Sequence, residues 1–149
     1  WREGRVSQVA VAGRSIPVTK PQTYMNCSGG FVREFALFHK IPPASILVVY
    51  DEMDLPLGRI RLRMGGSSAG HKGLESILEQ LAAQDVPRMR LGIGQRPKDS
   101  QGKDYVLDRF SERKIVEGML ARAAVALRCA VEDGLESAMN AYNAEPSEA

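Results

Sequence analysis

The run Ile46-Leu-Val-Val-Tyr50 constrains the fold of this chain more than any other segment. It is short, wholly apolar and rich in β-branched side chains, which is typical of a strand covered on both faces. Two further segments, 59–64 and 88–93, alternate polar and apolar side chains with the period of two that strands show. Because helices must cover such a sheet, the sequence predicts the α/β class.

A hairpin is expected near the start of the chain. Segments 6–12 and 15–19 read as strands, and Gly13-Arg14 between them is typical of a tight turn. Pro17 cannot donate a ladder hydrogen bond, so the second strand is expected at an edge or a bulge.

The remaining elements are expected to be helices. Ser28 and Ser111 stand where N-caps are expected, and Gly134 is a natural stop signal. No repeat or linker interrupts the chain, so residues 1–149 are expected to form one domain, a mixed, twisted β-sheet flanked by helices. The predicted helices are 28–39, a segment from Leu74 to Leu81, 111–131 and 135–142, with Val116, Leu120, Ala123, Leu127, Ala130 and Val131 on the apolar face of the third.

Net charge, cysteine spacing and the length of apolar runs limit the partners and the compartment expected for this chain. The 149 residues carry a net charge of only +2, so any attraction for a polyanion depends on where the basic residues lie. Cys27 and Cys129 lack metal-ligand spacing and are expected to be free thiols in a reducing compartment. No apolar run approaches the ~18 residues that cross a bilayer, and we expect a cytoplasmic protein without membrane association.

Three carboxylates follow the apolar run: Asp51, Glu52 and Asp54. A carboxylate at the end of a strand can orient an imidazole, act as a base or hold a cation. The same three residues also suit a solvated turn, and the sequence alone leaves both interpretations open.

The segment Gly65-Gly-Ser-Ser-Ala-Gly-His-Lys-Gly73 precedes a predicted helix and offers bare amides where the helix dipole favours anions. It is not a nucleotide phosphate loop, because His71 intrudes before Lys72 and Gly73 replaces the required hydroxyl. The glycines could also serve only the turn. His71 is a weak candidate for a general base, and His39 is expected to cap a helix.

Basic and amide side chains near the strand ends are candidate substrate contacts. A basic face that contacts phosphates, or alternatively a solvated sheet face, could be formed by Arg59, Arg61 and Arg63 with Arg88, Arg90 and Lys72. Asn26 precedes a helix start, where helix capping and substrate binding are equally compatible with the spacing.

Taken together, four ordered motifs resemble those of the bacterial-type peptidyl-tRNA hydrolase family. They are Pro21-Gln-Thr-Tyr-Met-Asn-Cys-Ser-Gly29, Asp51-Glu-Met-Asp-Leu-Pro-Leu-Gly58, the glycine loop 65–73 and Arg88-Met-Arg-Leu-Gly-Ile-Gly94. The resemblance covers about Val6 to Tyr142. It implies a monomeric enzyme that hydrolyses the ester between peptide and tRNA without a metal or an organic cofactor.

The resemblance also implies roles for particular residues. A histidine acts as base toward water, and Asp51 matches the aspartate that holds it. Asn26 matches an asparagine near the scissile ester, and Tyr24 matches a neighbour whose backbone lines the same site. Positions facing the peptide or the RNA are matched by Gly70, His71 and Lys72 and by Arg63, Arg88 and Arg90.

The chain departs from the family pattern in two places. The opening strand, with the catalytic histidine in a Thr-Arg-His-Asn segment, has no match, so we expect this chain to lack its N-terminal strand and loop. Lys72 stands where the family usually has asparagine, and lysine donates hydrogen bonds but cannot accept them.

Two alternatives remain open. One is a non-catalytic RNA- or protein-binding member of the same fold, comparable to the chloroplast relatives that assist splicing. The other is a nucleotide-dependent phosphotransferase, which the misplaced lysine disfavours.

Overall fold

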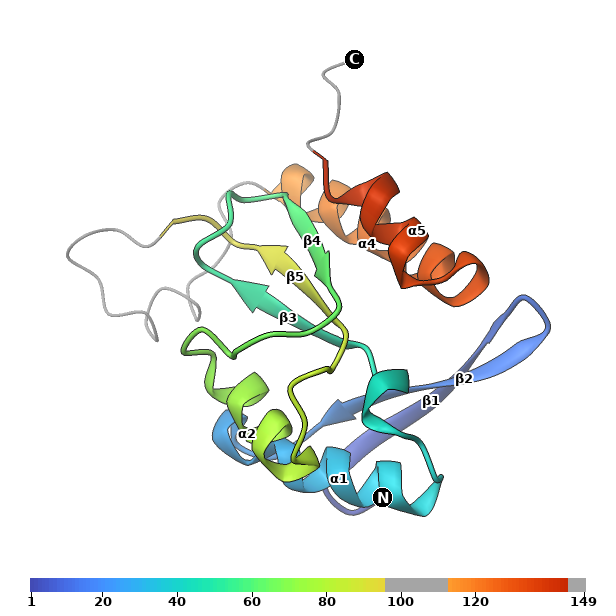
Figure 1. Cartoon of the computed structure of the whole chain (residues 1–149). Coiled ribbons are helices and arrows are strands. Elements are labelled where there is room, and N and C mark those ends of the chain that lie inside the picture. Colours follow the sequence, from blue (N-terminus) through green and yellow to red (C-terminus); the bar gives the residue numbers. More distant parts are fainter. Residues whose placement is uncertain (96–112, 145–149) are drawn as a thin grey trace. The chain divides into compact units, whose positions relative to one another are not determined.

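The computed structural model describes residues 1–95 and 113–144, and these residues form two compact units (Figure 1). The first unit comprises Trp1–Val48 and Met64–Pro87 and contains a hairpin and two helices. The second begins at Val49–Arg63, resumes at Arg88 and contains most of a three-stranded sheet and two further helices. The predicted α/β class is confirmed. Ser111, the predicted cap, lies outside the described residues.

The expected hairpin is present in the first unit. Strand β1 (Gly4–Val11) pairs antiparallel with β2 (Arg14–Pro21), and Pro17 lies on a strand that has one partner among the described residues. The turn is Ala12-Gly13, with φ values of 49° and 73°, one residue earlier than predicted. A two-residue hairpin turn of this kind needs left-handed backbone at both positions, which glycine adopts without strain.

Helix α1 (Ser28–Phe38) follows a single 3₁₀ turn, η1 (Met25–Cys27), and buries Phe31 and Phe35. The prediction that Ser28 is the N-cap is wrong. Because η1 leads directly into the helix, Cys27 takes the cap position, and the Ser28 hydroxyl donates to the Met25 carbonyl at 2.9 Å. His39 ends the helix, as predicted.

Helix α2 (Lys72–Leu81) packs closely against α1 (Figure 1). The Gly29 amide donates to the Ser76 hydroxyl at 2.9 Å, and a β-carbon on Gly29 would collide with the Ser76 backbone. The absence of a side chain at Gly29 therefore permits this close approach. η1, which directly precedes α1, also lies against α2.

The three-stranded sheet has the order β3-β5-β4, with β3 at Val48–Glu52, β4 at Ile60–Arg63 and β5 at Arg88–Gly92. β4 and β5 are antiparallel. Hydrogen bonds from the Val48 amide to the Pro87 carbonyl and from the Ile93 amide to the Glu52 carbonyl run in the parallel sense, so the sheet is mixed, as predicted. A 3₁₀ turn, η2 (Pro43–Ser45), precedes β3.

The expected alternation in β4 is confirmed, since Ile60 and Leu62 are buried while Arg61 and Arg63 are exposed. Met64 is exposed because the strand ends before it. The expected coverage of β3 on both faces is not found in the described residues, because Val49 is 42% exposed.

In the second unit, α4 (Arg113–Asp133) packs against α5 (Leu135–Tyr142), and α5 contacts β4. The buried positions of α4 are Met119, Ala123 and Ala126, spaced by four and three residues. Leu120, predicted on the apolar face, is exposed, since the buried face is centred one residue earlier.

The side chain of Asn143 pairs with the backbone of β4 just after α5. Its Oδ1 accepts from the Leu62 amide at 2.7 Å, and its Nδ2 donates to the Leu62 carbonyl at 3.0 Å. β4 is the edge strand of the described sheet on that side. The side-chain amide of Asn143 therefore makes the two hydrogen bonds that a neighbouring strand would otherwise make with Leu62.

Candidate functional site

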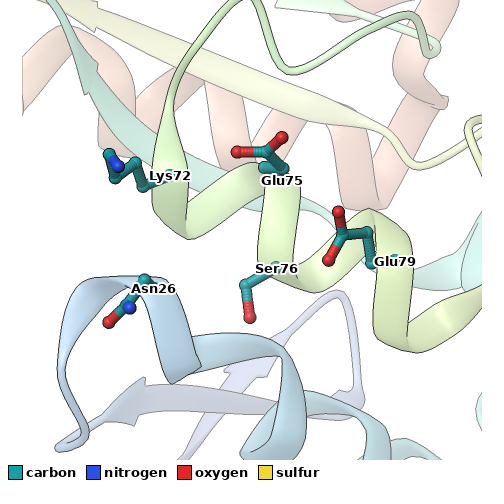
Figure 2. A pocket seen from close by; sticks show the side chains of 5 residues that line it. All are labelled: Asn26, Lys72, Glu75, Ser76 and Glu79. Carbon is teal, nitrogen blue, oxygen red and sulfur yellow. The ribbon is translucent and has the colours of Figure 1, made fainter.

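A hollow of about 270 Å³ lies between η1 and α2 in the first unit (Figure 2). Asn26, at the middle of η1, and Lys72, the first residue of α2, stand at the same end of it. Glu75, Ser76 and Glu79 complete the lining along α2. The structure therefore brings together Asn26 and Lys72, two residues that lie 46 positions apart in sequence.

Two glycines of the predicted loop shape this end of the hollow for different reasons. Gly70 has a φ of +83° and follows Ala69 in a turn that the His71 amide closes by donating to the Ser68 carbonyl at 3.0 Å. Gly73 is buried, and a β-carbon on it would stand 2.5 Å from the Met25 Sδ atom. Gly70 therefore serves the turn, whereas Gly73 allows η1 to lie against α2.

His71 is the N-cap of α2 and not a free imidazole. Its Nδ1 accepts a hydrogen bond from the Leu74 amide at 3.1 Å. An accepting Nδ1 carries no proton, so the ring is held in the tautomer that has its hydrogen on Nε2. The geometry supports helix capping, and it leaves Nδ1 unable to act as a general base.

Tyr24 is exposed beside the hollow rather than in its lining. Its carbonyl accepts from the Cys27 amide at 2.9 Å and from the Thr23 hydroxyl at 3.1 Å, while 85% of the residue is open to solvent. The backbone of Tyr24 thus anchors η1, which carries Asn26.

Asp51 belongs to the second unit, where it is the fourth residue of β3. The sequence predicts a strand that ends at Tyr50, but β3 continues through Asp51 and Glu52, because the Glu52 carbonyl still accepts a hydrogen bond from the amide of Ile93, the residue directly after β5. Asp51 is half-buried. Glu52 behaves as a turn residue, because its carboxylate accepts from the Asp54 amide at 3.2 Å.

The four predicted arginines lie on two paired strands. Arg61 is opposite Arg90 and Arg63 is opposite Arg88, so the antiparallel register places all four on one face of the sheet. Arg61 and Arg63 are exposed, and Arg90 is half-buried. Arg61 and Arg63 can therefore reach an anion, and Arg90 is open to one only in part.

Arg88 differs, because only 1% of it is exposed. Burial lowers the pKa of its guanidinium, while the nearby Tyr50 phenol, which is hydrogen-bonded to it, opposes that change. Burial likewise raises the pKa of Tyr50, against the attraction of Arg88 and Arg90. Arg88 is thus on the same face as the other three arginines but buried and hydrogen-bonded to Tyr50, so it is not exposed there.

Neither a metal site nor a membrane-spanning helix is found within the described ranges, 1–95 and 113–144. No cluster of three or more histidine, cysteine, aspartate or glutamate side chains there could hold a metal ion. Cys27 and Cys129 are free thiols, as predicted. In the same ranges, no helix is both long and apolar enough to cross a bilayer.

Sequence reasoning missed three residues of the hollow: Glu75, Ser76 and Glu79. Ser76 gave a usable signal, because a polar residue beside Ile77 and Leu78 interrupts the apolar face of a predicted helix. Its hydroxyl contacts Gly29 of α1, and that long-range partner is not visible from local spacing.

A family model described as peptidyl-tRNA hydrolase matches residues 2–149. Proteins named peptidyl-tRNA hydrolase from Carboxydothermus hydrogenoformans and Synechococcus sp. (strain JA-3-3Ab) are 45% and 44% identical, over 93% and 95% of this chain. The chain spans 74% of the first relative and 64% of the second.

Solved structures agree with the sequence relatives. A peptidyl-tRNA hydrolase in complex with N-propanol has a TM-score of 0.89 and 31% identity, covering 98% of this chain and 75% of that one. The enzyme from Acinetobacter baumannii has a TM-score of 0.88 and 32% identity, covering 95% and 73%.

Proposed function

Because this chain belongs to the peptidyl-tRNA hydrolase family, we propose that it hydrolyses the ester bond that joins a peptide to tRNA. The observation that carries this proposal is the family match over residues 2–149, together with relatives of that name at 44% and 45% identity. The alternative of a non-catalytic binding protein is not favoured, since these relatives are named as hydrolases.

Asn26 is assigned to the acyl side of the scissile bond. It lies at the middle of a 3₁₀ turn that Tyr24 and Gly73 hold in place, so its amide is presented at a defined position on the hollow. Lys72 shares that end of the hollow. Gly70 and His71 act by shaping the start of α2 beside it.

Asp51 is assigned to orient and charge-stabilise the imidazole that activates water. We assign that imidazole to neither histidine of this chain. The Nδ1 of His71 is occupied by the Leu74 amide, and the ring of His39 packs against Phe35 with 4.3 Å between centroids.

Arg61, Arg63 and Arg90 are assigned to the tRNA phosphates, since they share one sheet face and remain reachable. Arg88 is assigned to support that face through Tyr50. We propose that the protein acts as a cytoplasmic monomer, with peptidyl-tRNA as its substrate and without a cofactor.

The test compares Asp51→Ala with Asp54→Ala in the full-length protein. Loss of a general-base system costs about 10²- to 10⁴-fold in rate. We therefore expect Asp51→Ala to slow release of free tRNA by that order while tRNA affinity changes little. Asp54 is exposed and its amide serves only a turn, so its variant should retain the parent rate. Equal release by the parent and Asp51→Ala would refute the role of Asp51.

A further inference from the structure

Lys72 places an ammonium group at the Asn26 end of the hollow. The side chain is exposed, and it forms no ion pair within 4 Å with any other residue that the structure describes. Its charge is therefore available to a ligand that enters this end of the hollow.

The position of Lys72 is unfavourable for the helix itself. Lys72 is the first residue of α2, where the helix dipole favours negative and disfavours positive side chains. Glu75, in the same turn, has the favourable sign. Helix stability therefore does not account for a lysine at this position.

Asn26 is oriented to assist the same ligand. The Cys27 thiol donates to the Asn26 Oδ1 atom at 3.7 Å, so the Nδ2 group of Asn26 is the part of the amide that is left to donate. An ammonium and an amide N–H₂ at one end of a hollow form a pair of donors, and a carboxylate has the matching pair of acceptors.

We propose that Lys72 makes the Asn26 end of the hollow selective for an ionised carboxylate, the group that the peptide acquires on release from tRNA. Water adds to the neutral ester carbonyl, the bond between acyl carbon and ribose oxygen breaks, and the ribose oxygen leaves as a hydroxyl. The new carboxyl group, with an ordinary pKa of about 3.5, then loses its proton at neutral pH. Lys72 gains an anionic partner only after this step, so the Lys72 end of the hollow favours product over substrate.

Glu75 and Glu79 restrict where the carboxylate can bind. Both line the same hollow farther along α2 and repel an anion, so the carboxylate is held at the Lys72 end. Removing one of them should strengthen carboxylate binding, which is opposite to the effect of removing Lys72.

The test is a titration of the chain with N-acetyl-Ala-Ala and with its C-terminal amide at pH 7, followed by NMR chemical shifts of Asn26 and Gly73. The acid should bind about two- to fivefold more tightly than the amide, as expected for a solvent-exposed ion pair. The preference should disappear in Lys72→Met, rise in Glu79→Gln and persist in Lys114→Met, which removes an exposed lysine from α4.

Equal affinity for acid and amide in the parent chain would overturn the proposal, as would a preference that survives Lys72→Met or no binding of either compound. The inference rests on the proposed hydrolase function, but its test does not depend on catalysis. Failure of hydrolysis appears as unreleased tRNA in the assay above, whereas failure here appears only in the ratio of the two affinities.

Discussion

His71 shows at the scale of one residue why its position in the sequence did not define its role. A histidine after a glycine loop is compatible with catalysis, anion binding or capping, and only the contact between Nδ1 and the Leu74 amide separates these roles. That contact depends on the extended backbone of His71, with ψ of 111°. No residue spacing encodes this angle directly.

Replacement of His71 should therefore cost stability through the cap. We expect His71→Ala to lower the free energy of unfolding by about 0.5–2 kcal/mol, because the Leu74 amide loses its acceptor. His71→Asn restores a short capping acceptor and should recover most of the loss. Urea unfolding followed by circular dichroism measures both, and equal stability of all three proteins would contradict the capping role.

Tyr50 should make stability depend on pH in the alkaline range. Burial raises the pKa of its phenol above the ordinary value of 10.0, so the folded state holds this proton more tightly than the unfolded state does. The contribution is fully present below pH 10 and is lost as pH rises through the raised pKa.

Tyr50→Phe removes both the phenol and its hydrogen bond to Arg88. At pH 7 the variant should be less stable than the parent by about 1.5–3 kcal/mol, the range for a hydrogen bond to a charged group. Above pH 10 this gap should narrow, because only the parent has a phenol to ionise. Urea midpoints measured at pH 7, 9 and 10.5 check this, and a gap that stays constant would contradict it.

At the scale of elements, the crossing of α1 and α2 depends on one missing side chain. Gly29 lies against the Ser76 backbone, while the neighbouring Gly30 is exposed, and a β-carbon added to Gly30 would meet no atom within 4 Å. The two adjacent glycines therefore offer a matched pair of variants within one helix.

Gly29→Ala should force the helices apart and lower the free energy of unfolding by about 1–3 kcal/mol, as overpacking does. Gly30→Ala should leave packing intact and raise stability by about 0.5–1 kcal/mol, because alanine favours helix over glycine. Thermal unfolding of the two variants gives shifts of opposite sign if this is correct. A loss of similar size in both would mean that the crossing has no special need for Gly29.

Periodicity predicted the elements better than their ends. The hairpin, the alternating strand at Ile60–Arg63 and the helix at Ser28–Phe38 follow from local patterns of apolar, glycine and proline residues. The hollow did not, because it requires Gly29 to meet Ser76 and Gly73 to meet Met25, and both contacts join residues that lie about fifty positions apart. Arg88 shows the same limit, since alternation assigned it to a face but could not reveal its burial beside Tyr50.

At the scale of the whole molecule, charge is nearly balanced, so binding to RNA must depend on local placement. With a net charge of only +2, the chain has no general excess of positive charge. The exposed arginines of β4, Arg61 and Arg63, are then the groups that should set the salt dependence of tRNA binding.

Arg61→Gln and Arg63→Gln should each weaken tRNA binding and reduce the slope of log K against log salt concentration by about 1. Arg33→Gln, an exposed arginine on α1, serves as the charge-matched control and should leave the slope unchanged. Filter binding at several potassium concentrations measures the slopes. Identical slopes for all three variants would show that β4 does not contact the phosphates.

The two hydrogen bonds between the Asn143 side chain and the Leu62 backbone also affect how copies of this protein can associate. An edge strand with bare amides and carbonyls is a template on which a strand of another molecule can add, and repeated addition leads to fibrils. Asn143 already satisfies the amide and carbonyl of Leu62, so an incoming strand finds that step of β4 occupied. In the part of the chain that the structure describes, a side chain far from β4 in sequence thus covers one step of the strand that would otherwise be open to an incoming strand.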